Sequence, residues 1–190
     1  LREQENLSIM MNEEDHLRIQ AMSDGLDLPG AAEKCFHAED QLSRHVTFAF
    51  DEQLGYLTAC PTNTGTGMRA SLLLHLPMLT LCKQRGNGGQ IVAKVGLTIR
   101  GVCGEGSEAL GNLYQVSNQV TLGRTEQELI SAVTAVGHQL SDMERAMRDK
   151  SQAVSRINLE DAVFRAWALL SNARMMPQPE FFRLWTSLRL

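Results

Sequence analysis

The hydrophobic pattern of this 190-residue chain changes at Thr125. Before that point, short apolar runs are separated by turns rich in glycine, threonine and asparagine, which is typical of short strands joined by loops. From there, Thr125-Glu126-Gln127-Glu128 matches a helix capping box, and apolar residues recur at helical spacing. Because a part rich in strands precedes a helical part, we predict an α+β fold.

The strands and helices can be placed approximately from these patterns. Strands are expected at 7–11, 16–22, 46–50, 56–59, 69–76, 97–102 and 113–122. Helices are expected at 29–45, 78–84, from 125 to about 150, and in the last forty residues as two pieces broken around Pro177 and Pro179. The run 69–76 fits either a strand or a helix, and Pro77 favours the strand.

Length and composition exclude several classes of protein. The chain suffices for one domain, or for a truncated domain with an appendage, and we place the boundary between 1–150 and 151–190. A net charge of −4 gives no support to a nucleic-acid surface. No apolar run approaches a membrane span and no signal peptide is evident, so we expect a cytoplasmic protein without membrane contact. The absence of an initiator Met suggests a piece of a longer polypeptide.

Three clusters of residues could carry chemistry. Glu14, His16, Arg18 and Gln20 are expected on one strand face. About 13 Å between the Glu14 and Arg18 Cα atoms would suit an elongated ligand such as ATP. The alternative is a solvated acidic turn before an amphipathic strand. The loop 60–71 suits phosphate or is an ordinary turn-rich connection, and 100–108 has the composition of a mobile substrate loop. Neither loop matches a P-loop or the glycine loop of protein kinases.

These clusters together resemble a known family. Asn12-Glu13-Glu14-Asp15-His16-Leu17-Arg18, Cys60-Pro61-Thr62-Asn63 with Gly65-Thr66 and Arg69-Ala70-Ser71, and Arg100-Gly101 with Gly104-Glu105 look like the ATP:guanido phosphotransferases. The segments 100–112 and 115–123 most resemble the bacterial protein-arginine kinases of that family, which phosphorylate arginine side chains of proteins. The resemblance implies a mostly antiparallel, curved sheet flanked by helices.

The resemblance also implies roles for individual residues. Glu14 and Glu105 would hold the target guanidinium, and Cys60 would lie beside it. Arg18, Arg69 and Arg100 would clamp the phosphates of ATP, which acts with Mg²⁺. Further nucleotide contacts would come from the segments that follow two of these arginines, namely Ala70, Ser71, Leu72 and Leu73, and Gly101, Val102, Cys103, Gly104 and Glu105.

Other polar residues are expected to be structural. His75 lies in an apolar run and does not coincide with the nucleotide-contacting histidine of the family, whose place is taken by Leu73. Cys35, Cys82 and Cys103 are interpreted as ordinary thiols. The four cysteines form no CxxC pair and no zinc-ligand spacing, which argues against a zinc site or a disulfide scaffold.

Differences from the family pattern leave alternatives open. The N-terminal portion of family members, with further phosphate-binding arginines, is missing, and 158–176 looks like only the start of their C-terminal helical domain. The chain could therefore be an inactive fragment that binds arginine or phosphoarginine as a module, or part of a kinase for a small guanidino substrate. Expected partners are proteins with exposed arginine, together with activator and protease partners of the stress response; a homodimer is left open.

Overall fold

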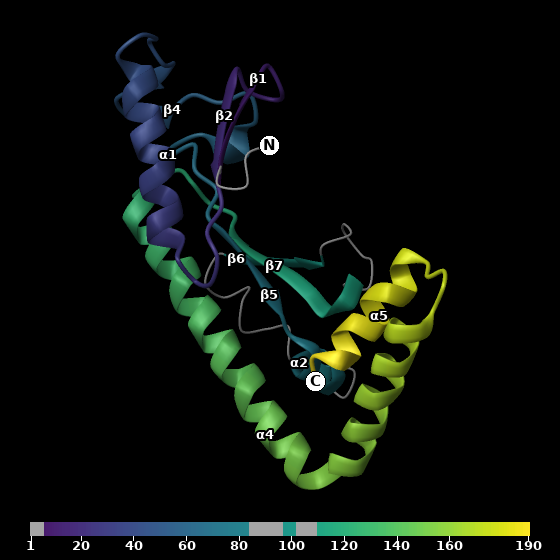
Figure 1. Cartoon of the computed structure of the whole chain (residues 1–190). Coiled ribbons are helices and arrows are strands. Elements are labelled where there is room, and N and C mark those ends of the chain that lie inside the picture. Colours follow the sequence, from purple (N-terminus) through teal and green to yellow (C-terminus); the bar gives the residue numbers. More distant parts are fainter. Residues whose placement is uncertain (1–5, 84–96, 102–109) are drawn as a thin grey trace. The chain divides into compact units, whose positions relative to one another are not determined.

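The structure is a computed structural model that describes residues 6–83, 97–101 and 110–190, with the backbone alone at 82–83, 97, 99–101 and 152–155. The fold is α+β, as the sequence predicts (Figure 1). Two compact units can be separated by their internal contacts. Unit 1 contains Leu1–Leu72 and Ser117–Ala135, and unit 2 contains Leu73–Val116 and Val136–Leu190.

Unit 1 begins with the predicted strand, turn and strand. β1 (Leu7–Met11) pairs with β2 (Leu17–Ala21) in an antiparallel ladder that joins Leu7 to Ala21 and Met11 to Leu17. Along β2 the apolar residues are half-buried, whereas Arg18 and Gln20 are exposed. The expected division of this strand into a packed face and a polar face is therefore confirmed.

Helix α1 (Leu28–Ser43) packs on β2 and begins where the sequence predicts (Figure 1). The Asp27 side chain accepts a hydrogen bond from the Gly30 N–H at 3.0 Å and so caps the first turn. The hairpin that follows is shorter than predicted, because only β3 (Phe50–Asp51) and β4 (Gly55–Tyr56) pair. Tyr56 also exchanges two main-chain hydrogen bonds with Gly65.

A second set of strands confirms that the apolar run before Pro77 is a strand. β5 (Ser71–His75), β7 (Leu113–Asn118) and β6 (Leu97–Gly101) form a sheet in the order β5-β7-β6. The short helices are η1 (Pro61–Asn63), α2 (Pro77–Lys83) and η2 (Leu110–Asn112). β7 stops at Asn118 instead of 122, and the apolar residues beyond it, Val120 and Leu122, are about half exposed.

The helical part differs from the prediction at one boundary. The capping box of α4 (Glu126–Asn172) is confirmed: the Thr125 N–H donates to Glu128, and the Glu128 N–H donates to the Thr125 hydroxyl. However, α4 continues past 150, and the expected end there is wrong because 141–172 contains no glycine or proline to stop it. The predicted break near Pro177 is confirmed, since α5 (Gln178–Leu188) begins directly after it.

Each unit has its own buried apolar side chains. Those of unit 1 include Ala38, Ala70, Leu72, Leu129, Ile130 and Val133. Those of unit 2 include Leu74, Leu76, Met78, Leu79, Val116, Leu140, Ala166 and Leu184. Within the described ranges, no helix is both long enough and apolar enough to cross a bilayer.

Candidate functional site

The acidic turn between β1 and β2 is a tight reversal. The Asn12 N–H donates to the His16 carbonyl at 3.0 Å, and Asn12 adopts a left-handed conformation with φ of 54°. Glu14 is therefore exposed in a bend and does not lie on the extended strand. The estimate of about 13 Å between Glu14 and Arg18 assumed four extended residues, and this assumption does not hold, because β2 begins only at Leu17.

Arg18 projects from the exposed face of β2 and is paired with a neighbour from the turn. Its guanidinium lies 2.7 Å from the carboxylate of Glu13, and both side chains are about half exposed. Ion pairs of this kind contribute between 0 and about 1 kcal/mol. A phosphate group, which accepts two parallel hydrogen bonds from a guanidinium, can therefore replace Glu13 at little cost.

A hydrogen bond joins the acidic turn to the loop that carries Cys60. The half-buried Asp15 accepts the Ala59 N–H at 2.6 Å. The Cys60 Sγ lies 3.0 Å from the Thr62 hydroxyl, and the thiol is half-buried. The structure thus brings the turn of Glu14 beside the Cys60 loop.

The far side of the same loop is anchored to the chain after β7. The buried Thr121 hydroxyl lies 2.9 Å from the Thr62 carbonyl and 2.7 Å from the Thr64 carbonyl. Gly65 has a φ of 117°, and a Cβ atom there would lie 2.6 Å from the Thr121 carbonyl oxygen. Only glycine fits this contact, so Gly65 fixes how closely the loop approaches Thr121.

The predicted nucleotide residues at the start of β5 are unequally accessible. Arg69 is exposed, and Leu73 is 61% exposed. Ser71 is half-buried, whereas the Ala70 and Leu72 side chains are buried. Side-chain contact with a ligand is therefore open to Arg69, Ser71 and Leu73, and Leu72 could contribute only main-chain atoms.

The remaining predicted site residues belong to β6 and to the sequence that follows it. Val102, Cys103, Gly104 and Glu105 lie outside the described residues, and Arg100 and Gly101 are described by their backbone in β6. The predicted convergence of Glu105 and Arg100 with the other site residues stays a prediction. Among the described residues, no group of three or more His, Cys, Asp or Glu side chains is arranged to hold a metal ion.

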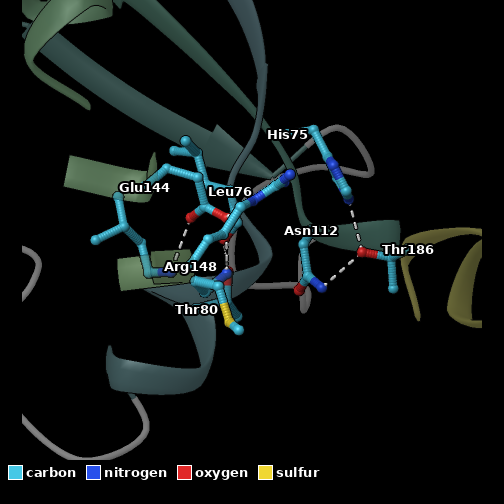
Figure 2. A network of polar contacts seen from close by, with 9 residues as sticks. His75, Leu76, Thr80, Asn112, Glu144, Arg148 and Thr186 are labelled. Atoms are coloured by element: carbon cyan, nitrogen blue, oxygen red, sulfur yellow. Dashed lines mark hydrogen bonds and ion pairs between the residues drawn. The ribbon is translucent and has the colours of Figure 1, made fainter. Parts of the chain in front are cut away.

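Cys35 and His75, which were not expected to take part in the site, are both half-buried. Burial raises the pKa of the Cys35 thiol, whose Sγ lies 4.0 Å from the Ile19 carbonyl. His75 Nε2 is 2.7 Å from the Thr186 hydroxyl (Figure 2). The His75 ring also packs on Trp185. Burial, with the charges of Arg148 and Arg189, lowers the pKa of His75 to about 4. His75 is therefore neutral at pH 7, which supports the predicted structural role.

Sequence reasoning missed the residues that support the site, chiefly Asn118 and Thr121. Both are buried polar residues just at or after the end of β7, and their partners lie 48 to 59 residues away in the chain. No local pattern marks such contacts. The only available signal was that a buried polar side chain needs partners, which becomes useful once burial is known.

The chain matches a family model described as the ATP:guanido phosphotransferase C-terminal catalytic domain, over residues 1–147. It is 49% identical over its whole length to a protein-arginine kinase of Moorella thermoacetica, covering 54% of that protein. It is 45% identical over its whole length to a protein-arginine kinase of Bacillus velezensis, covering 52% of that protein. The chain thus spans about half the length of these relatives.

Solved structures with a similar fold include two other kinases. The duplicated taurocyamine kinase of Schistosoma mansoni, with bound transition-state-analogue components, has a TM-score of 0.68 and 32% identity. That comparison covers 80% of this chain and 21% of the kinase chain. A lombricine kinase has a TM-score of 0.65 and 30% identity, covering 76% of this chain and 40% of the other.

Proposed function

The chain belongs to the ATP:guanido phosphotransferase family, and from that premise we propose that it is part of an enzyme that phosphorylates arginine side chains of proteins. The observation that carries this proposal is the 49% identity, over the whole chain, to a relative named protein-arginine kinase. The solved taurocyamine and lombricine kinases, whose names indicate small guanidino substrates, are only 32% and 30% identical.

The chemistry requires acidic side chains beside the guanidinium that accepts the phosphoryl group. A guanidinium is protonated at neutral pH and its nitrogen lone pairs are delocalised, so it is a poor nucleophile until it is aligned and loses a proton. One of its nitrogens then bonds to the γ-phosphorus while the bond from phosphorus to the ADP oxygen breaks. Glu14, exposed beside the Cys60 loop, is proposed to align the guanidinium and accept that proton together with Glu105.

Cationic side chains are needed around the phosphates of ATP, which is the phosphoryl donor. The transferring phosphoryl group carries negative charge on its equatorial oxygens, and fixed guanidinium groups stabilise that charge without reorganising. Arg18 and Arg69, both exposed, are proposed to bind the phosphates with Arg100. Mg²⁺ would arrive as part of the nucleotide substrate, because it is held in such sites largely by phosphate oxygens and water.

Several wider expectations belong to the same proposal. We place the catalytic domain at 1–150 and the start of a helical domain at 151–190, near the end of the family match at 147. We also propose that the whole protein acts in the cytoplasm on proteins with exposed arginine, under activator and protease partners of the stress response. Self-association into a homodimer can be tested on the same preparation by light scattering.

The test uses the full-length protein that carries this chain. Phosphoarginine formed from Mg-ATP and a protein substrate is measured by mass spectrometry for the wild type, Glu14→Gln and Arg69→Ala. We expect product from the wild type and a loss of at least about a hundredfold in Glu14→Gln. Equal activity of Glu14→Gln and the wild type would remove Glu14 from the mechanism.

Two further measurements address the alternative functions. Phosphorylation of free arginine as efficiently as protein would indicate a kinase for small guanidino substrates. A thermal shift with Mg-ATP that Arg69→Ala abolishes supports the kinase. Peptide binding without any nucleotide effect would indicate a non-catalytic module that recognises arginine or phosphoarginine.

A further inference from the structure

Asn118, the last residue of β7, holds the main chain on both sides of Arg69. Its side-chain Oδ1 accepts the Ala70 N–H at 2.8 Å, and its Nδ2 donates to the Met68 carbonyl at 3.1 Å. Its own main-chain N–H donates to the Ala70 carbonyl at 3.4 Å. Asn118 itself is only 4% exposed. The residues before and after Arg69 are therefore both fixed by one buried side chain.

The amide is suited to this position by its chemistry. It offers an acceptor and a donor at the two ends of one rigid plane, whereas a carboxylate offers acceptors only. An aspartate here would keep the acceptor for Ala70 but turn an oxygen toward the Met68 carbonyl. A leucine would leave both main-chain groups without partners. The arrangement thus requires asparagine for both contacts at once.

A fixed backbone matters because Arg69 is proposed to clamp the phosphates of ATP. Its side chain is exposed and makes no hydrogen bond or ion pair with another described residue. A long side chain on a mobile backbone would lose more freedom when it clamps a phosphate than one on a fixed backbone. Small displacements of groups at a reaction site reduce rates strongly. The fixed backbone limits both losses.

We propose that Asn118 is a positioning residue for nucleotide binding, acting through the main chain of Arg69. This inference rests on the proposed function, in which Arg69 clamps the phosphates of ATP. It assigns to the buried end of β7 a part in nucleotide affinity, although the Asn118 side chain itself is buried.

The first experiment measures the dissociation constant of Mg-ATP and the KM for a protein substrate in the full-length protein. We expect Asn118→Asp to weaken nucleotide binding about tenfold and to leave the protein-substrate KM within about twofold of wild type. Asn112→Asp is the matched control. Its side-chain nitrogen donates to the Thr186 hydroxyl at 3.0 Å, in unit 2, so its loss should leave the affinity for ATP unchanged.

A double-mutant cycle separates positioning from general stability. If Asn118 acts through Arg69, Asn118→Asp should cause no further loss of ATP affinity in the Arg69→Ala background. Losses that add in full, or equal changes in ATP affinity and protein-substrate KM, would overturn the inference. If Asn118→Asp does not fold, Asn118→Ser, which retains one oxygen near the Ala70 N–H, is measured in its place by the same criteria.

The outcomes also separate this inference from the proposed function. A wild-type protein that binds no ATP overturns the proposed function, and the role of Asn118 with it. If Asn118→Asp and Asn118→Ser bind ATP as tightly as the wild type does, only the role of Asn118 is overturned.

Discussion

An arginine–glutamate pair in unit 1 and one of those in unit 2 differ in burial. In unit 1, Arg18 lies 2.7 Å from Glu13, and both side chains are about half exposed. In unit 2, Arg148 lies 3.1 Å from Glu144, whose side chain is only 6% exposed. Glu144, which Figure 2 shows beside Arg148, also accepts the N–H groups of Met78 and Leu79 at 3.0 and 2.9 Å.

The shorter contact is the less important one for stability. Water competes for both members of the exposed pair, so breaking it changes little. Removing one partner of a buried charge leaves the other groups without compensation, which is costly. The comparison shows that burial, more than distance, separates a charge available to a ligand from one that maintains the fold.

Loss of the buried carboxylate should have the largest effect on stability. Glu144→Ala leaves Arg148 and two amides of α2 without their acceptor, at a cost of about 3–5 kcal/mol. Urea unfolding followed by circular dichroism measures the change. Glu144→Gln retains one acceptor oxygen and should cost less. A loss below about 1 kcal/mol for Glu144→Ala would contradict the assignment of this carboxylate to the fold.

Loss of the exposed arginine should affect binding more than folding. We expect Arg18→Ala to weaken Mg-ATP binding by roughly ten- to a hundredfold, the value of a hydrogen bond to a charged group. The free energy of unfolding should change by less than about 1 kcal/mol. Calorimetric titration of the full-length protein measures the first quantity, and urea unfolding measures the second. Unchanged ATP affinity would show that Arg18 is not a phosphate ligand.

His75 should make unit 2 sensitive to acid. Its pKa is about 4 in the fold and 6.5 in an unfolded chain, so protons bind preferentially to the unfolded state between these values. Its stabilising contribution is complete above pH 6.5 and is lost as the pH falls toward 4. Because the ring is partly exposed, we expect about 1 kcal/mol.

The check compares urea unfolding at pH 7 and pH 5 for the wild type and His75→Gln. The variant should lose less stability on acidification than the wild type does. The other four histidines are exposed and common to both proteins, so they cancel in the comparison. Equal losses in the two proteins would assign the acid sensitivity to other groups.

The smallest effect is expected when the partner of Arg18 is removed. Glu13→Gln should change the free energy of unfolding by less than about 0.5 kcal/mol. It frees the guanidinium, so Mg-ATP should bind as tightly as in the wild type or slightly more tightly. A clear loss of ATP affinity would show that Glu13 orients Arg18 instead of merely neutralising it.

Elements with local signals could be predicted from the sequence. The alternation along β2 and the reciprocal hydrogen bonds of Thr125 and Glu128 depend on residues a few positions apart, and both predictions are confirmed. The end of β7 was predicted four residues too late. The apolar alternation continues through Val120 and Leu122, but the ladder ends at Asn118, whose side chain binds elsewhere.

The motifs predict which residue types make up the candidate site, but not the residues that hold its elements in place. Glu14, Arg18, Cys60 and Arg69 stay predictions as site residues, and the structure shows the turn of Glu14 beside the Cys60 loop. The groups that hold these elements, Asn118 and Thr121, act on residues 48 to 59 positions away. Such contacts are set by tertiary packing, which no periodicity in the sequence records.

The dependence of α2 on Glu144 has a consequence for synthesis of the protein. The acceptor for the Met78 amide lies 66 residues further along the chain. At roughly 5–20 residues per second, a ribosome needs about 3–13 seconds to add that length. During that interval the first turn of α2 has no carboxylate to complete it. This short helix therefore belongs among the late-forming parts of the nascent polypeptide, although it is made early.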